Sequence, residues 1–186
     1  MATPDAFKVV TLITGASSGI GAGTAVLFAK LGARLALNGR DVDSLTKVDK
    51  ECEACGPVKG ATNLLKFPKG AATKERLGNT VLAYCMSKSA IDQFTRCVAL
   101  ELASQQVRVN AVCPGVIITE VHKRAGLDED QYAQFLEKCK VTHALGRPGE
   151  VEEVAHAIAF LASDAATFIT GVNLPVDGGR HAMCPR

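Results

Sequence analysis

Long hydrophobic runs, strong charge of either sign and a secretory leader are all missing from this sequence. No apolar stretch reaches the roughly 18 residues that cross a bilayer. The net charge of only +2 excludes the strong field typical of proteins that bind nucleic acid or anionic membranes. The first residues lack the basic-then-apolar pattern of a signal peptide. We therefore expect no membrane partner, no nucleic-acid partner and a cytoplasmic location.

Paired metal-ligand motifs are also missing, although the chain has seven cysteines. Only Cys52 and Cys55 have a metal or redox spacing, and no second such pair and no suitable histidine cluster accompany them. Two thiols near a helix end are thus favoured over a zinc or redox site, and we predict no metal. An odd number of cysteines without a leader indicates reduced thiols.

The bulk composition is that of a globular protein. The chain has 186 residues, of which 47% are hydrophobic and 22% charged, with no internal repeat. This length suits one domain with a real core. We expect a single domain over residues 1–186.

A glycine-rich stretch, Thr14 to Gly21, organises the rest of the chain. It follows the apolar run 9–13, typical of a buried strand, and precedes apolar residues at helical spacing up to Leu31. A glycine turn between a strand and a helix allows a pyrophosphate to approach the free N–H groups of the helix N-terminus. An ordinary strand-to-helix turn is the alternative, but the flanking strand and helix favour dinucleotide binding.

Strands and helices alternate after this turn. The hydrophobic pattern predicts strands over 34–38, 107–113 and 168–176 and helices over 43–55, 84–103 and 151–162. The stretch 56–79, rich in Gly, Pro and basic residues, reads as a loop with at most a short strand over 62–67.

The end of the second strand bears on the choice of nucleotide. An acid about 20 residues past the glycine turn would hold the 2′-hydroxyl of NAD. Here Gly39 and Arg40 occupy that region, and the guanidinium of Arg40 can bind a 2′-phosphate. We therefore expect NADP rather than NAD. In the alternative, Arg40 is a solvated turn residue for which Asp41 competes.

Tyr84 and Lys88 lie four residues apart and share one helix face. A phenol that gives a proton to a forming alkoxide needs a neighbour that favours the phenolate, and an ammonium one turn along does so. By itself the spacing is common, and a surface pair is the alternative. Three further segments follow in order: Val107 to Val112, then Pro114-Gly115, then Asp177-Gly178-Gly179.

Taken together, these motifs closely resemble the short-chain dehydrogenase/reductase family over about residues 8–55 and 81–179. The resemblance implies a Rossmann-like three-layer αβα sandwich with a parallel sheet, here with fewer strands than the family norm. It also implies an oxidoreductase, with Tyr84 as acid/base and Lys88 as its partner. A small carbonyl or alcohol would be the substrate, residues 120–147 would cover it, and Ser87 would support the helix. We also expect a homo-oligomer. The cofactor-binding residues would be Gly15, Ser17, Ser18, Gly19, Ile20, Gly21, Arg40, Tyr84, Lys88, Pro114, Gly115, Ile117 and Thr119.

The sequence departs from the family pattern between its two matching blocks. The family has several strand–helix units there, with an Asn-Ala-Gly motif and a serine thirteen residues before the tyrosine. This chain has about twenty residues in their place and Ala71 at the serine position, with Thr73 and Thr80 nearby. A βαβ unit alone needs roughly 30 residues. The sequence therefore predicts a shortened member in which the loop 56–79 replaces central units.

Two functions are compatible with this departure. One is NADP-dependent reduction of a ketone or oxidation of a secondary alcohol. The other is a catalytically impaired variant that binds nucleotide or a full-length subunit without turnover. A turnover assay with NADPH distinguishes them.

Overall fold

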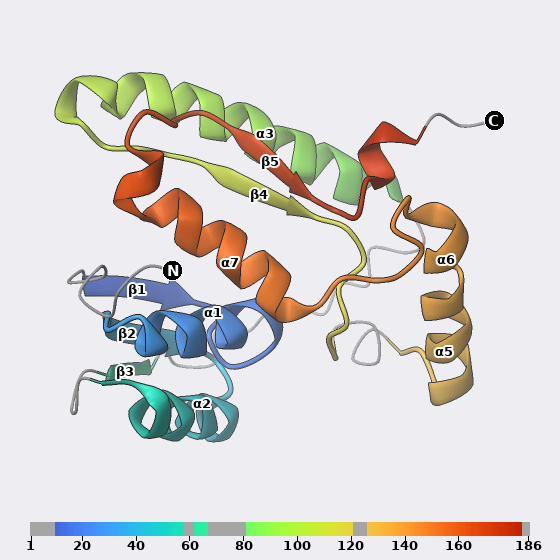
Figure 1. The fold of residues 1–186 in the computed structure, drawn as a ribbon, viewed down its shortest axis with the longest axis horizontal. Coiled ribbons are helices and arrows are strands. Elements are labelled where there is room, and N and C mark those ends of the chain that lie inside the picture. The colour runs from blue at the N-terminus through green and yellow to red at the C-terminus, as the bar shows by residue number, and fades with distance from the viewer. Residues whose placement is uncertain (1–9, 58–61, 67–80, 121–125, 184–186) are drawn as a thin grey trace.

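A computed structural model describes residues 10–57, 62–66, 81–120 and 126–183. Its helices and strands alternate along the chain as the sequence predicts (Figure 1). The strands are β1 (Val10–Thr14), β2 (Arg34–Gly39), β3 (Thr62–Lys66), β4 (Ala111–Pro114) and β5 (Asn173–Val176). The longer helices are α1 (Gly19–Lys30), α2 (Val42–Cys55), α3 (Val81–Leu102), α5 (Glu129–Glu137) and α7 (Val151–Ala162), and α6 (Cys139–Thr142) is a single turn.

The strands form two parallel sheets. The first has the order β1-β2-β3, with Val10 opposite Arg34 and Leu35 opposite Thr62. The second consists of β4 and β5, with Ala111 opposite Asn173. The stretch 56–79 was predicted as a loop with at most a short strand over 62–67, and residues 62–66 of it form the strand β3. Parallel strands with helices on their faces give the predicted three-layer αβα arrangement.

The core lies between the first sheet and the helices α1 and α2. Alternate residues of β2, Leu35 and Leu37, point into it because successive strand side chains face opposite sides of a sheet. They pack with Phe28 of α1 and Leu45 of α2, all buried. This core fixes the start of α1, and with it the glycine-rich turn.

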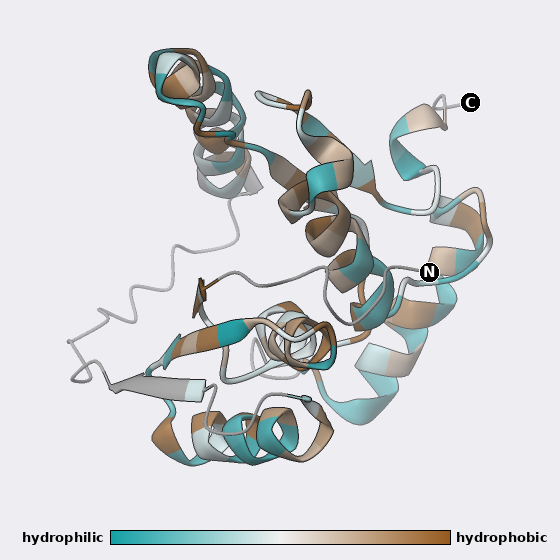
Figure 2. Ribbon diagram, turned by 60° about the vertical axis from the view of Figure 1, so that its left-hand side comes forward, coloured by the Kyte–Doolittle hydropathy of each residue, from teal (hydrophilic) through white to brown (hydrophobic). Residues whose placement is uncertain are grey.

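Helix α7 joins the two halves of the molecule. It packs along α1, and it also contacts β4 and β5 (Figure 1). Gly23 of α1 permits the close approach, because a side chain there would collide with Val151 of α7. The buried face of α7 consists of Val154, Ala155, Ala159 and Leu161. In both views the two sheets form separate halves with α7 between them (Figure 2).

The face of β1 that points away from the core lies open among the described residues. Val10 is 75% exposed and Leu12 is 60% exposed, whereas Ile13 on the other face is buried. Among the described strands none pairs with the free edge of β1, because β4 pairs with β5 instead. The apolar side chains of β1 that point away from the core therefore stay exposed.

The two C-terminal strands are shorter than predicted. The segments 107–110 and 168–172 were expected to be strand and are not. The side chain of Asn110 replaces the ladder there, since its Nδ2 donates to the Ile169 carbonyl and its Oδ1 accepts from the Val172 amide. Such side-chain hydrogen bonds compete with regular pairing. Gly171, at φ +76°, turns the chain just before β5.

Arg108 fastens this region to the end of α7. Its guanidinium donates to the carbonyls of Leu161 at 2.6 Å and Ser163 at 3.3 Å. These carbonyls lie at the C-terminus of the helix, where a cation is favourable. Helix α3 covers the other side of the second sheet, and the Nδ2 of Asn173 donates to the carbonyl of Asp92. None of the described helices is long and apolar enough to cross a membrane.

Candidate functional site

The glycine-rich turn forms an open backbone cradle at the start of α1. Gly15 and Gly19 have φ of +69° and +56°, in the left-handed region that favours glycine. The amide of Ala16 donates to the carbonyl of Asn38 at 2.9 Å, which ties the turn to β2. A Cβ atom on Gly15 would have no neighbour within 4 Å, and the first turn of α1 has no acidic residue. The cradle therefore fits an anionic group.

The end of β2 lies beside this cradle. Gly39 is buried, and a Cβ atom there would lie 3.1 Å from the Cβ of Ser17. Arg40 is exposed. Asp41 was a competitor for its guanidinium, but the Asp41 carboxylate caps α2 and accepts hydrogen bonds from the amide and hydroxyl of Ser44. The structure thus places Ser17 against Gly39, and the exposed Arg40 is the next residue along the chain.

The segment Pro114 to Thr119 leaves the carboxyl end of β4 and returns toward the cradle. The amide of Gly115 donates to the carbonyl of Val176, and Ile117 forms a bridge with Gly149. A Cβ atom on Gly19 would lie 3.4 Å from Cγ2 of Thr119. This contact joins the segment to the glycine turn, although the two are about a hundred residues apart in sequence. We call residues 114–119 the β4 loop.

Tyr84 and Lys88 lie on one face of α3, as predicted. The Nζ of Lys88 is 5.3 Å from the centroid of the Tyr84 ring. The hydroxyl of Ser87 donates to the Tyr84 carbonyl at 2.7 Å, so it serves the helix, as expected. Tyr84 is 64% exposed.

The structure brings the glycine turn, the end of β2 and the β4 loop together, and it places Tyr84 and Lys88 on a separate helix. The N-terminal end of α3 lies at the same side as the carboxyl ends of β4 and β5 (Figure 1). No hydrogen bond or ion pair of the described residues joins Tyr84 or Lys88 to the β4 loop. Ala71, Thr73 and Thr80 lie outside the described residues, and so does most of the stretch 56–79.

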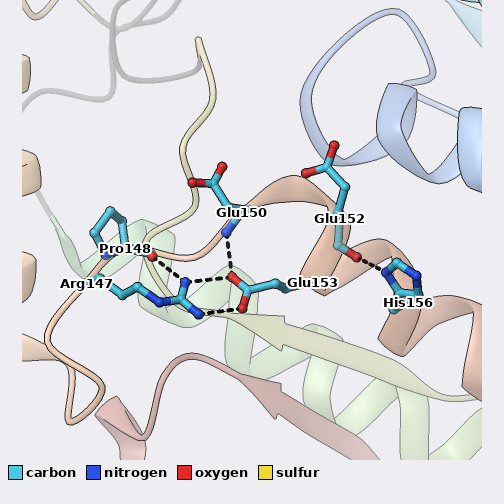
Figure 3. Close-up of polar contacts among 6 residues, drawn as sticks. All are labelled: Arg147, Pro148, Glu150, Glu152, Glu153 and His156. Carbon is cyan, nitrogen blue, oxygen red and sulfur yellow. Dashed lines mark hydrogen bonds and ion pairs between the residues drawn. The ribbon is translucent and has the colours of Figure 1, made fainter.

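A cavity of about 340 Å³ lies next to the β4 loop. An ion pair stands in its wall: Arg147 donates to both carboxylate oxygens of Glu153, at 2.9 and 2.7 Å (Figure 3). The Glu150 amide adds a third bond, at 2.8 Å. Hydrogen bonds from Arg147 and then from Glu150 lower the pKa of Glu153 to about 2. The lining includes Val116, Ile117, Leu145, Pro148, Gly149, Pro175, Val176, Asp177, Gly178, Gly179 and His181.

Asp177 supports the far wall of this cavity. Burial opposes its ionisation, but hydrogen bonds from the His181 side chain and from the amides of His181 and Gly179 outweigh burial and lower its pKa. Its carboxylate is therefore charged at neutral pH and holds the turn after β5.

Sequence reasoning missed several residues that shape the site. Glu150 and Glu153 have capping-box spacing, which could have marked the start of α7. The hydroxyl of Tyr132 donates to the Thr119 carbonyl at 3.2 Å, a contact that no local pattern indicates. His143 gave no local signal either, because the Val116 amide that it binds is 27 residues away.

The cysteine pair is unsuited to redox chemistry. Cys52 is buried in the core, and burial, followed by the charge of Cys55, raises the pKa of its thiol to about 12. At neutral pH this thiol is protonated, and the thiolate is the reactive form.

Comparison with known proteins gives two family matches. A profile described as short chain dehydrogenase matches residues 9–65, and one described as Enoyl-(Acyl carrier protein) reductase matches residues 70–181. An L-xylulose reductase of Caenorhabditis elegans is 40% identical over 122 residues, which cover 66% of this chain and 45% of that protein. The aligned part thus spans less than half of this relative.

A longer alignment shows that a relative has residues that this chain lacks. Glucose 1-dehydrogenase of Gluconobacter oxydans is 30% identical over 244 positions, covering 90% of each chain. This alignment is longer than the 186 residues of the chain. The relative therefore carries residues that have no counterpart here.

Solved structures share the fold. A short-chain dehydrogenase/reductase from Caenorhabditis elegans superposes with a TM-score of 0.84 at 22% identity, covering 98% of each chain. L-Sorbose reductase from Gluconobacter frateurii, complexed with NADPH and L-sorbose, gives 0.78 at 21% identity, covering 99% of this chain and 100% of that one.

Proposed function

Because the chain belongs to the short-chain dehydrogenase/reductase family, we propose that it reduces a ketone, or oxidises a secondary alcohol, with NADP(H). The observation that carries this proposal is the Tyr84–Lys88 pair on one face of α3, in a chain that also has an open glycine-lined cradle at the start of α1. Relatives that act on small polyols and ketones, such as L-xylulose reductase, support a small carbonyl or alcohol as substrate.

The residues present fit a dinucleotide. The open turn at Gly15 and the start of α1 would hold the pyrophosphate, together with Ser17, Ser18, Ile20 and Gly21. Pro114, Gly115, Ile117 and Thr119 of the β4 loop would border the nicotinamide, and Lys88 would reach its ribose. When bound, the nicotinamide supplies or accepts the hydride.

Tyr84 would move the proton. In the direction of reduction its hydroxyl gives a proton to the oxygen of the carbonyl group, and in oxidation the phenolate takes the proton from the alcohol. Lys88, whose ammonium lies 5.3 Å from the centroid of the Tyr84 ring, would be the partner of this acid/base group.

NADP is proposed over NAD because of the end of β2. Gly39 places no carboxylate where the adenosine ribose would lie, and Ser17 is adjacent. Arg40 is exposed at this point, and its planar fork can bind a 2′-phosphate in a bidentate manner. The NADPH bound to L-sorbose reductase agrees with this choice.

Three broader features complete the proposal. We propose a single dinucleotide-binding domain over residues 1–186, in which the stretch 56–79 replaces central strand–helix units. The exposed apolar side chains Val10 and Leu12 on the open face of β1 support a homo-oligomer. Thiols at Cys52 and Cys139, both buried, support a reducing, cytoplasmic location.

The test is turnover of NADPH with a panel of small ketones by wild type, Tyr84→Phe and Met86→Leu. Loss of the acid/base group should lower kcat by about 10²–10⁴-fold while the Kd for NADPH stays within a factor of three. Met86→Leu, an exposed change on the same helix, should keep the wild-type rate. Tight NADPH binding with no turnover by wild type would instead favour the catalytically impaired variant.

A further inference from the structure

His143 is buried, whereas His156 and His181 lie on the surface. It is 2% exposed and directly follows α6. The segment that contains it was expected only to cover a substrate. Its ring instead lies against the β4 loop, where a Cβ atom on Gly115 would come within 2.9 Å of its Nε2.

The hydrogen bonds of His143 define one tautomer. The Val116 amide donates to Nε2 at 3.2 Å, so that nitrogen must carry the lone pair. The proton is then on Nδ1, which lies 3.1 Å from the hydroxyl oxygen of Thr142. That hydroxyl in turn donates to the Lys138 carbonyl at 3.0 Å. With this tautomer, every donor in this series of hydrogen bonds meets an acceptor.

A second contact holds the other end of the β4 loop. Tyr132 of α5 is 9% exposed, and its hydroxyl donates to the Thr119 carbonyl at 3.2 Å. Val116 and Thr119 are thus both held by side chains of the segment 128–143. The backbone of Gly149 also binds the loop: its carbonyl accepts from the Ile118 amide and its amide donates to the Val116 carbonyl. Two of the contacts that fix the loop thus come from buried side chains.

From this geometry we infer that His143 is a positioning residue for the nicotinamide end of the dinucleotide, acting through the Val116 amide. The inference rests on the proposed function. His143 does not touch the glycine turn or Arg40, which would hold the adenosine half. Its loss should therefore affect one end of the ligand and spare the other.

The experiment titrates NADPH and 2′,5′-ADP against wild type, His143→Phe, His143→Gln and His156→Phe. Phenylalanine fills the site but cannot accept the Val116 bond, so His143→Phe should weaken NADPH about tenfold, the effect of one lost hydrogen bond. Binding of 2′,5′-ADP, which lacks the nicotinamide, should change by less than twofold. Glutamine offers an acceptor oxygen and should recover most of the NADPH affinity. His156→Phe, an exposed control, should match wild type.

The outcomes separate the inference from its premise. Equal loss of both ligands in His143→Phe, or no loss of NADPH, would overturn the positioning role while leaving the proposed function intact. A wild type that binds neither ligand would overturn the proposed function and the inference with it. If His143→Phe fails to fold, Tyr132→Phe tests the other end of the loop, and it too should weaken NADPH but not 2′,5′-ADP.

Discussion

Helices α3 and α7 flank the same two-stranded sheet, yet their surroundings differ sharply. Val154 and Ala155 of α7 are fully buried, because α7 packs on α1 as well as on β4 and β5. On α3, apolar side chains such as Phe94 and Leu100 are exposed, the latter by 79%. Helix α3 carries Tyr84 and Lys88, so the residues proposed for chemistry lie on the less buried helix. The helix that joins the two halves is thus not the helix that carries the proposed acid/base group.

The largest test of this difference introduces one carboxylate on each helix. Val154→Asp places an unpaired charge in a fully buried site of α7 and should lower the free energy of unfolding by more than about 3 kcal/mol. Leu100→Asp on α3 should change it by less than about 0.5 kcal/mol. Urea denaturation followed by circular dichroism measures both. Similar losses in the two variants would show that α3 is as well packed as α7.

The next test addresses nucleotide binding in the first half of the molecule. Arg40→Ala should weaken NADPH by about 10–100-fold, the loss of a charge-assisted hydrogen bond, and leave NADH nearly unchanged. Arg34→Ala, which removes another exposed arginine from β2, is the matched control. Fluorescence titration with both nucleotides gives the answer. Equal losses of NADPH and NADH would remove the case for NADP.

The helices, unlike the sheet edges, followed from the sequence. The spacing of Val154 and Leu161 identified α7, and the glycine turn identified the β1–α1 junction, because these signals are local. The shortening of β4 and β5 was not predictable, since it depends on Asn110 bonding to Ile169 and Val172. For the same reason His143, Tyr132 and the Arg147–Glu153 pair escaped notice: their partners are set by the fold.

A third test addresses the open face of β1. Leu12→Lys should weaken self-association roughly tenfold, because the ammonium must be desolvated at any contact through this face. Leu100→Lys places the same charge on the exposed part of α3 and serves as the comparison. Sedimentation velocity over a range of concentrations measures both. Stronger dissociation by Leu100→Lys would assign self-association to α3.

The smallest effect concerns the Arg147–Glu153 pair at the entry to α7. The pKa of Glu153, about 2 in the folded state, lies below its ordinary value of 4.5. The contribution of this pair is therefore complete above pH 4.5 and is lost as the pH falls toward 2. Both side chains are about half exposed, so solvent screening keeps it small.

Thermal melts of wild type and Glu153→Gln between pH 7 and pH 2 test this dependence. The difference in Tm between the two should be greatest at neutral pH and should vanish near pH 2. Glu152→Gln, an exposed neighbour outside the pair, should follow wild type throughout. A difference that stays constant over this range would mean that the charge of Glu153 is irrelevant to stability.

The registers of the two sheets imply an order of events during synthesis. Val10 pairs with Arg34 and Leu35 with Thr62, whereas Ala111 pairs with Asn173, more than twice as far along the chain. Pairing across a longer loop is entropically costlier and slower. The first sheet can therefore close while the ribosome is still making α3, and the second must wait until the last residues emerge. The glycine-rich turn between β1 and α1 would thus be in place before α7, the helix that packs against both halves.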